Sequence, residues 1–261
     1  MFLTDSIKRV VIKIGTSTLT HSSTGRLDLR HLETLARILS DIKNMGIDVA
    51  LVTSGAIGVG MSKLGMTVRP KELRYKQAAA AIGQCELMHI YDKFFLDYSQ
   101  VVGQVLITKS DIVEDARREK VEDTFEALFE LDAIPVVNEN DTTGVDEILF
   151  GDNDTLSAEV AALVGADLLI ILSDINGLYD SDPRENENAK IIPRVTEITD
   201  EIRALAGGAG TKLGTGGMVT KIHAAEVCFE HSVPMVIANG DRLENIYDII
   251  GGKISGTLFM K

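Results

Sequence analysis

The chain has 261 residues, of which 45% are hydrophobic and 25% charged, and its formal net charge is −13 at pH 7. This composition excludes a disordered chain, and the length allows a substantial buried core. The negative charge opposes nonspecific attraction to nucleic acid or to anionic membranes, so we expect neither as a partner. The sequence shows no signal-peptide pattern and no apolar run long enough to cross a bilayer, and we therefore expect a cytoplasmic protein.

Strand-like and helix-like runs alternate along almost the whole chain. In chain order, the sequence predicts a strand at 9–15, a helix at 29–42, a strand at 48–53, a helix at 71–98, a strand at 101–108, a helix at 117–131, a strand at 134–138, a helix at 153–164, a strand at 168–173, helices at 198–206 and 218–231, and strands at 233–238 and 256–261. Residues 141–150 resemble a short β excursion, and residues 182–190 form a polar loop.

The predicted strands are continuous apolar runs, which is typical of parallel strands that are buried on both faces. The sequence therefore predicts an α/β fold, a three-layer sandwich in which a mainly parallel sheet carries helices on both sides. No linker or repeat of fixed period divides the chain. We expect a single domain spanning residues 1–261.

The two cysteines, Cys85 and Cys228, both lie in apolar helical patterns. Two such residues do not make a disulfide framework or a cysteine metal site. We expect both side chains to pack in the core.

Lys13 lies inside the first apolar strand, in Val-Val-Ile-Lys-Ile. Ligands of parallel α/β sheets gather outside the carboxyl ends of the strands, where this lysine would lie. A buried ammonium without a partner is costly, which favours a functional role for Lys13. The alternative is a lysine whose charged end reaches the solvent past the edge of the sheet.

An acidic and amide cluster, Asp152, Asn153 and Asp154, precedes an apolar helical pattern. One of these residues is expected to cap the helix. A cap needs one such residue and the chain has three in a row, so we expect a role in a site for at least one other.

The segment from Gly214 to Lys221, Gly-Thr-Gly-Gly-Met-Val-Thr-Lys, places three glycines before a helix that carries a lysine in its first turns. Backbone N–H groups, the helix N-terminus and the lysine together favour phosphate binding. The alternative is a flexible turn before a surface helix. The segment lacks the Walker A spacing.

Together these residues resemble the amino-acid kinase family. The resemblance rests on five motifs in order along an alternating β/α chain: Val11-Ile-Lys-Ile-Gly-Thr-Ser17, Val52-Thr-Ser-Gly-Ala-Ile57, Val137-Asn-Glu-Asn-Asp141, Gly151-Asp-Asn-Asp154 and Leu213-Gly-Thr-Gly-Gly-Met218 with Lys221. The third and fourth motifs favour, within the family, the enzymes that phosphorylate the γ-carboxylate of L-glutamate in the first step of proline biosynthesis.

The resemblance implies roles for the matching residues. Lys13 and Lys221 would neutralise the transferring phosphoryl group, and Asp154 would orient both lysines. The glutamate-binding residues would be Ser54, Gly55, Asn138, Asp141 and Asn153. The nucleotide-binding residues would be Lys13, Gly15, Thr16, Ser173, Asp174, Thr215, Gly216, Gly217, Met218 and Lys221.

The resemblance also implies Mg²⁺ and ATP, a homo-oligomer (a dimer or a tetramer) and feedback inhibition by proline at or beside the glutamate site. The N-terminal part would mainly bind glutamate and the C-terminal part mainly ATP. Many members carry a C-terminal PUA domain, which we do not expect in this chain. The resemblance leaves the protein ligands of Mg²⁺ unassigned.

The chemistry of such a reaction suits the residues present. A carboxylate is already ionised at neutral pH and needs no general base, so none of the five histidines is expected to be catalytic. Residues alone do not separate glutamate from the acceptors of sister kinases: acetylglutamate, aspartate, carbamate, UMP or isopentenyl phosphate. A nucleotide-binding regulator without turnover is a further alternative, and the retention of both lysines with Asp154 argues against it.

Overall fold

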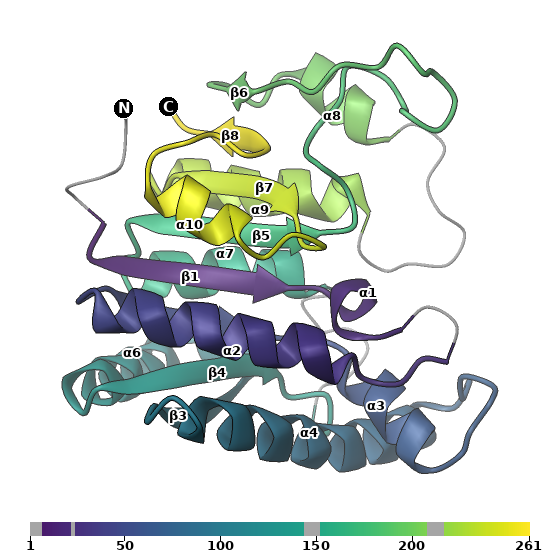
Figure 1. Cartoon of the computed structure of the whole chain (residues 1–261), viewed down its shortest axis with the longest axis vertical. Helices are drawn as coiled ribbons and strands as arrows, with labels where there is room; N and C mark the ends of the chain where they lie inside the picture. The colour runs from purple at the N-terminus through teal and green to yellow at the C-terminus, as the bar shows by residue number, and fades with distance from the viewer. Residues whose placement is uncertain (1–6, 22–23, 144–151, 208–216) are drawn as a thin grey trace. The chain divides into compact units, whose positions relative to one another are not determined.

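The computed structural model describes residues 7–21, 24–143, 152–207 and 217–261 (Figure 1). The chain divides into two compact units. Unit 1 comprises Met1–Lys13 and Gly151–Lys261, and unit 2 comprises Ile14–Phe150. No helix in the described ranges has the length and apolar character that a membrane span requires.

Unit 1 is built on strands in the order β1-β5-β7-β8-β6. Their bounds are β1 Arg9–Ile14, β5 Leu168–Ser173, β6 Arg194–Val195, β7 Met235–Asn239 and β8 Thr257–Phe259. β5 and β7 are parallel, and β8 runs antiparallel to β7. Every residue of β5 is buried, as expected for a parallel strand covered on both faces.

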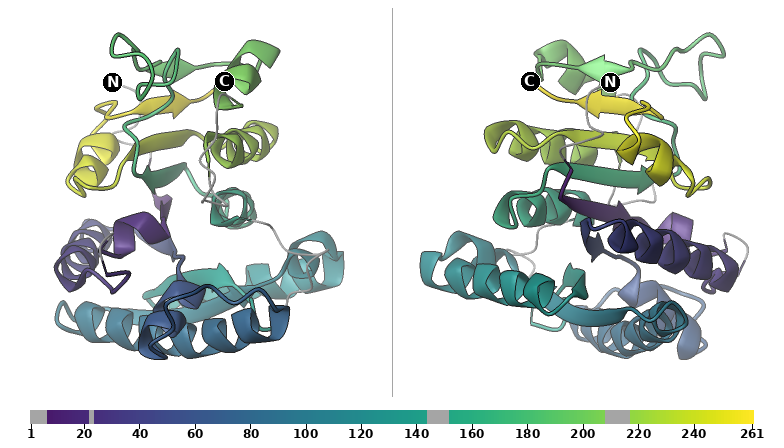
Figure 2. Two further views of the ribbon diagram at one scale, coloured as in Figure 1. Left: turned by 90° about the vertical axis from the view of Figure 1, so that its right-hand side faces the viewer. Right: turned by 60° about the vertical axis from the view of Figure 1, so that its left-hand side comes forward.

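Helices cover both faces of the unit 1 strands (Figure 2). α7 (Asn153–Leu163) and α9 (Met218–Glu230) pack against each other on one face, and α10 (Asn245–Ile250) lies on the other. α8 (Asp200–Ala206) packs against α9.

Unit 2 is built on three parallel strands in the order β3-β4-β2. Their bounds are β2 Asp48–Val52, β3 Val101–Ile107 and β4 Ala133–Glu139. α2 and α4 cover one face and α6 the other (Figures 1 and 2). The helices of this unit are α1 Thr16–Leu19, α2 Leu29–Asn44, α3 Ala56–Lys63, α4 Leu73–Leu96, α5 Lys109–Val113 and α6 Asp115–Glu130.

Two glycines let α3 and α4 cross at very close range. A Cβ atom on Gly83 of α4 would lie 1.7 Å from the Ala56 carbonyl oxygen, and one on Gly60 of α3 would lie 1.8 Å from the Ala79 carbonyl oxygen. No residue with a side chain fits at either position. The crossing therefore fixes the first residue of α3 against the middle of α4.

The structure contains each strand and helix that the sequence predicts within the described residues, with shifts of a few residues at the ends. The sequence did not predict five short elements: α1, α3, α5, β6 and α10. Of the predicted β excursion, residues 141–143 form a turn and the rest lies outside the described residues. Residues 182–190 are a loop, as predicted.

The expectation for Cys85 was wrong. Cys85 is exposed, whereas Cys228 is buried as expected. Both residues lie in apolar helical sequence, but Cys85 lies on the side of α4 that lines a pocket in unit 2.

Candidate functional site

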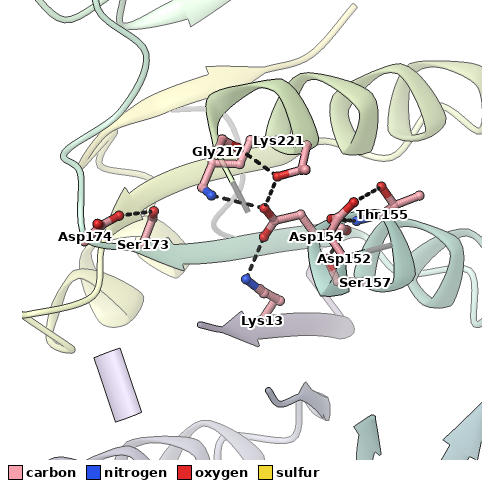
Figure 3. Close-up of polar contacts among 10 residues, drawn as sticks. Lys13, Asp152, Asp154, Thr155, Ser157, Ser173, Asp174, Gly217 and Lys221 are labelled. Carbon is pink, nitrogen blue, oxygen red and sulfur yellow. Dashed lines mark hydrogen bonds and ion pairs between the residues drawn. The ribbon is translucent and has the colours of Figure 1, made fainter. Parts of the chain in front are cut away.

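The central feature of unit 1 is a buried carboxylate held between two ammonium groups. Lys13 Nζ lies 2.7 Å from Asp154 Oδ1, and Lys221 Nζ lies 3.0 Å from Asp154 Oδ2. Figure 3 shows the carboxylate pointing between the two lysine side chains. The three side chains are 9%, 1% and 5% exposed for Lys13, Asp154 and Lys221, so their charges act on one another largely shielded from water.

Three secondary-structure elements bring these residues together. Lys13 is the penultimate residue of β1, at its carboxyl end. Asp152 caps α7, and its side chain accepts a hydrogen bond from the backbone N–H of Thr155, which places Asp154 in the first turn of that helix. Lys221 lies in the first turns of α9. Within the acidic cluster, Asp152 therefore caps the helix, and Asp154 pairs with the two lysines.

The electrostatics of the cluster favour the charged form of Asp154. Burial alone would raise its pKa, but Lys13 and Lys221 outweigh burial and lower the pKa to about 2. Burial lowers the pKa of Lys13, and the neighbouring Lys221 charge lowers it further, although Asp154 opposes both effects. The three side chains by themselves carry one net positive charge, and the Asp152 carboxylate also acts on Lys13.

Thr220 is a further member of this cluster, and sequence analysis did not predict its contact with Asp154. Its Oγ1 lies 2.7 Å from Asp154 Oδ2 and 2.8 Å from the Gly217 carbonyl oxygen. The hydroxyl has one proton to donate, so the two acceptors share it. The available signal in the sequence was its position one residue before Lys221. Both residues lie on α9, which packs against α7, the helix that begins at the acidic cluster.

The predicted phosphate-binding segment is described only in part. Gly217 is the N-cap residue of α9 and Met218 its first residue, so the helix N-terminus adjoins Thr220 and Lys221. Thr215 and Gly216 lie outside the described residues.

Further predicted nucleotide residues follow β5. Ser173 Oγ donates a hydrogen bond of 3.1 Å to Asp174 Oδ1. Close by in sequence, Asn176 helps to line a pocket of about 370 Å³ with Asn239, Asp241 and Arg242. The pocket belongs entirely to unit 1 and presents amide, carboxylate and guanidinium groups.

The predicted glutamate residues of unit 2 lie at the carboxyl ends of its strands. Ser54 and Gly55 follow β2, and Gly55 has the left-handed φ of 92° that leads into α3. A Cβ on Gly55 would approach Thr16 Cγ2 to 3.1 Å, and Thr16 itself follows Gly15, the N-cap residue of α1.

Asn138 and Asp141 come from the end of β4 and the turn that follows. Asn138 is buried and its Nδ2 donates to Gln84 Oε1 at 2.8 Å. Burial raises the pKa of Asp141, against the opposing effect of Arg69. Asp141 lines a second pocket, of about 400 Å³, within unit 2. The remaining predicted glutamate residue, Asn153, is the first residue of α7 in unit 1.

The residues that the structure describes contain no group of three or more His, Cys, Asp or Glu side chains able to hold a metal ion.

Comparison with known proteins decides the family. The family model described as "Amino acid kinase family" matches residues 8–239. The chain belongs to the amino acid kinase family. The match confirms the predicted resemblance and spans both units.

Similar amino acid kinases include one named "Glutamate 5-kinase" from Clostridium acetobutylicum, which is 55% identical over 255 residues, covering 98% of this chain and 95% of the relative. Another of the same name, from Carboxydothermus hydrogenoformans, is 51% identical over 254 residues, covering 97% of this chain and 68% of the relative.

Solved structures show that the fold is that of amino acid kinases, as predicted. UMP kinase from Ureaplasma parvum superimposes with a TM-score of 0.68 at 16% identity, covering 98% of this chain and 99% of the other. Isopentenyl phosphate kinase from T. acidophilum superimposes with a TM-score of 0.66 at 17% identity, covering 96% and 99%.

Proposed function

We propose that the protein is a glutamate 5-kinase, which transfers the γ-phosphoryl group of ATP to the γ-carboxylate of L-glutamate as the first step of proline biosynthesis. The observation that carries the proposal is the buried Lys13–Asp154–Lys221 cluster. Relatives of this name are 55% and 51% identical over nearly the whole chain, and this similarity supports the choice of glutamate among the acceptors of the family.

The chemical difficulty of this reaction is charge. A γ-carboxylate oxygen forms a bond to the γ-phosphorus while the bond from that phosphorus to the β,γ-bridging oxygen breaks, and ADP leaves. No proton needs to move, because the attacking carboxylate is already ionised. An anion must approach a polyanion, so positioning and positive charge dominate catalysis.

The cluster in unit 1 suits this task. Lys13 and Lys221 are catalytic residues in the proposal, because their ammonium groups stabilise the negative charge on the transferring phosphoryl oxygens. Asp154 orients both groups through one carboxylate. The first backbone N–H groups of α9, beginning at Gly217, add partial positive charge at the same point.

We assign nucleotide binding to the remaining predicted residues of unit 1. Ser173 and Asp174 would contact the nucleotide, with the 370 Å³ pocket beside Asn176 as the place for its base or ribose. Thr215 to Lys221 would cover the phosphates, and Gly15 and Thr16 would offer hydrogen-bond donors to them.

Mg²⁺ would supply Lewis-acid stabilisation of the phosphates. The described residues do not form a metal cage, so the phosphate oxygens and water would provide most of its ligands.

We assign glutamate binding to Ser54, Gly55, Asn138, Asp141 and Asn153. We further propose, on the resemblance alone, a homo-oligomeric enzyme of the cytoplasm that proline inhibits at or beside the glutamate site. Sedimentation of the purified protein tests the oligomer, and inhibition kinetics with L-proline test the inhibition, both separately from the reaction.

Trapping with hydroxylamine tests the reaction. An acyl phosphate reacts with hydroxylamine to give a hydroxamate, so the purified protein is incubated with Mg-ATP, hydroxylamine and one acceptor at a time: L-glutamate, N-acetyl-L-glutamate, L-aspartate or carbamate. UMP and isopentenyl phosphate, which give no acyl phosphate, are scored by ADP release. We expect hydroxamate with L-glutamate alone. Product from another acceptor would assign the protein to a sister kinase, and ATP binding without any product would assign it to a regulator.

A further inference from the structure

Unit 2 contains a pocket of about 400 Å³ beside the predicted glutamate residues. Ala56 at the start of α3, Gln84 and Cys85 on α4, Gln104 on β3 and Asp141 after β4 lie among its lining residues. Of these, only Asp141 belongs to the binding residues that the sequence identifies.

Gln84 is the unusual member of the lining. Its side chain is buried, with 8% of the residue exposed, and its Nε2 has no hydrogen-bond partner among the described residues. A buried donor that remains unpaired is costly, and such groups in native proteins require an explanation.

The hydrogen-bond network fixes the orientation of this amide. The backbone N–H of Glu139 donates to Asn138 Oδ1 at 2.9 Å, so Asn138 Nδ2 must be the atom that faces Gln84. Asn138 Nδ2 donates to Gln84 Oε1 at 2.8 Å. A flipped Gln84 would put two donors face to face, and therefore Nε2 is the free end of the amide.

The surroundings of Gln84 indicate which kind of acceptor would form a hydrogen bond with this donor. Gly83 packs against the Ala56 carbonyl, which holds Gln84 close to the N-terminus of α3. A helix N-terminus favours a negatively charged group. Two acidic residues, Glu139 and Asp141, also line the pocket and favour a positively charged group. An α-amino acid carries both charges, on an ammonium and a carboxylate group bonded to the same carbon atom.

We propose that Gln84 is a substrate-recognition residue whose Nε2 donates a hydrogen bond to the α-carboxylate of the acceptor amino acid, while Asp141 binds its α-ammonium group. This inference rests on the proposed function, since it assigns the γ-carboxylate to phosphoryl transfer and the other two charged groups to this pocket.

The variant Gln84→Glu isolates the free donor. It keeps an oxygen to accept from Asn138 Nδ2 and replaces the NH₂ group with an acceptor that repels a carboxylate. Gln104→Glu is the matched control, because Gln104 lines the same pocket but is exposed. Gln84→Met, which removes donor and acceptor together, serves if Gln84→Glu does not fold.

Steady-state kinetics give the first measurement. We expect Gln84→Glu to raise KM for L-glutamate by about 10- to 100-fold, the cost of losing a hydrogen bond to a charged group, with KM for ATP unchanged. Inhibition by 4-aminobutyrate, which lacks the α-carboxylate, should change by less than about twofold. The inference would be overturned if KM for L-glutamate were unchanged in Gln84→Glu, or if Gln104→Glu raised this KM equally. It would also be overturned if Gln84→Glu weakened inhibition by 4-aminobutyrate as much as it raised KM for L-glutamate.

Cys85 provides a second measurement that does not depend on turnover. It is the exposed cysteine and lines the pocket, whereas Cys228 is buried and burial raises the pKa of its thiol to about 12. L-glutamate should slow alkylation of Cys85 by N-ethylmaleimide. In Gln84→Glu, the L-glutamate concentration that gives the same protection should be about 10- to 100-fold higher. If the wild-type protein forms no hydroxamate, the proposed function fails, and alkylation alone tests the inference. The inference is then wrong if L-glutamate gives no protection, or if Gln84→Glu leaves the protection unchanged.

Discussion

Lys13 Nζ lies 2.7 Å from Asp154 Oδ1, and both side chains are buried in unit 1. Each group is costly to bury alone, and Lys221 shares the same carboxylate, so the three side chains together carry one net positive charge. Positive charge at a buried site favours an anionic ligand.

Lys13→Ala should lower kcat on the order of 10³-fold, because it removes one of two groups that stabilise charge in transfer. Initial rates at saturating ATP and glutamate measure this effect. Lys43→Ala is the control, since Lys43 is also buried and paired with an acidic residue, Asp132, but belongs to α2. Similar kcat losses in the two variants would remove Lys13 from the mechanism.

Asp154→Asn should destabilise the protein by about 3–5 kcal/mol at pH 7, because two buried ammonium groups lose their counter-charge. Burial and Lys221 would then hold the pKa of Lys13 below its ordinary value against only the smaller opposing effect of Asp152, so the folded state would bind fewer protons than the unfolded state. Stability of the variant should therefore increase as the pH rises from 7 towards 10. Urea unfolding across this range checks the slope, and a flat profile contradicts it.

The same carboxylate predicts an acid limit for the wild-type protein. The folded pKa of about 2 lies below the ordinary value of 3.8, so ionised Asp154 contributes about 2 kcal/mol above pH 4 and loses it as the pH falls through 2. Carboxyl signals followed by NMR through an acid titration would test the folded value directly.

Thr220→Val should lower kcat by about 3- to 30-fold, since it removes a hydroxyl that bonds Asp154 Oδ2 while nearly preserving side-chain volume. Thr34→Val is a suitable control: the hydroxyl of Thr34 bonds only the Arg30 carbonyl of its own helix in the described contacts, as Thr220 bonds the Gly217 carbonyl. A loss of stability without a change in kcat would limit Thr220 to a structural role.

Asp141→Asn should raise KM for L-glutamate by about 10- to 100-fold with KM for ATP unchanged, because the charge that meets the α-ammonium group is removed. Burial raises the pKa of Asp141, so in the wild-type protein KM for glutamate should also rise as the pH is lowered towards this pKa and the carboxylate is protonated. An unchanged KM for glutamate in the variant would exclude Asp141 from the pocket's function.

Gly83→Ala should destabilise the protein by at least about 3 kcal/mol, because its Cβ would lie 1.7 Å from the Ala56 carbonyl oxygen. Gly58→Ala in α3 meets nothing within 4 Å and should be neutral or stabilising by up to about 1 kcal/mol. Thermal unfolding of both variants compares them. Equal melting temperatures would mean that α3 and α4 separate easily.

Sequence analysis predicted the buried strands and long helices because their apolar residues follow clear periods. It did not predict α3, whose sequence Ala-Ile-Gly-Val-Gly-Met-Ser-Lys contains two glycines that disfavour a helix in isolation. Tertiary packing explains the difference, since Gly60 is needed for the close approach to α4.

The site was predictable where a residue or a short motif is unusual in its own segment. A lysine within an apolar strand identified Lys13, whereas Thr220 and Gln84 are ordinary polar residues in helices. Their importance depends on contacts with Asp154 and Asn138, which are distant in sequence. Cys85 was misplaced for the same reason, because an apolar helical pattern does not reveal that a pocket borders one side of α4.

Thr257, in the C-terminal strand β8, fastens the loop that follows Ser173. Its hydroxyl accepts from the Leu178 N–H at 2.8 Å and donates to the Ile192 carbonyl at 2.7 Å, so one side chain clamps both ends of that loop. Loss of this threonine would consequently loosen the segment bearing Asp174 and Asn176, where we propose that the nucleotide binds.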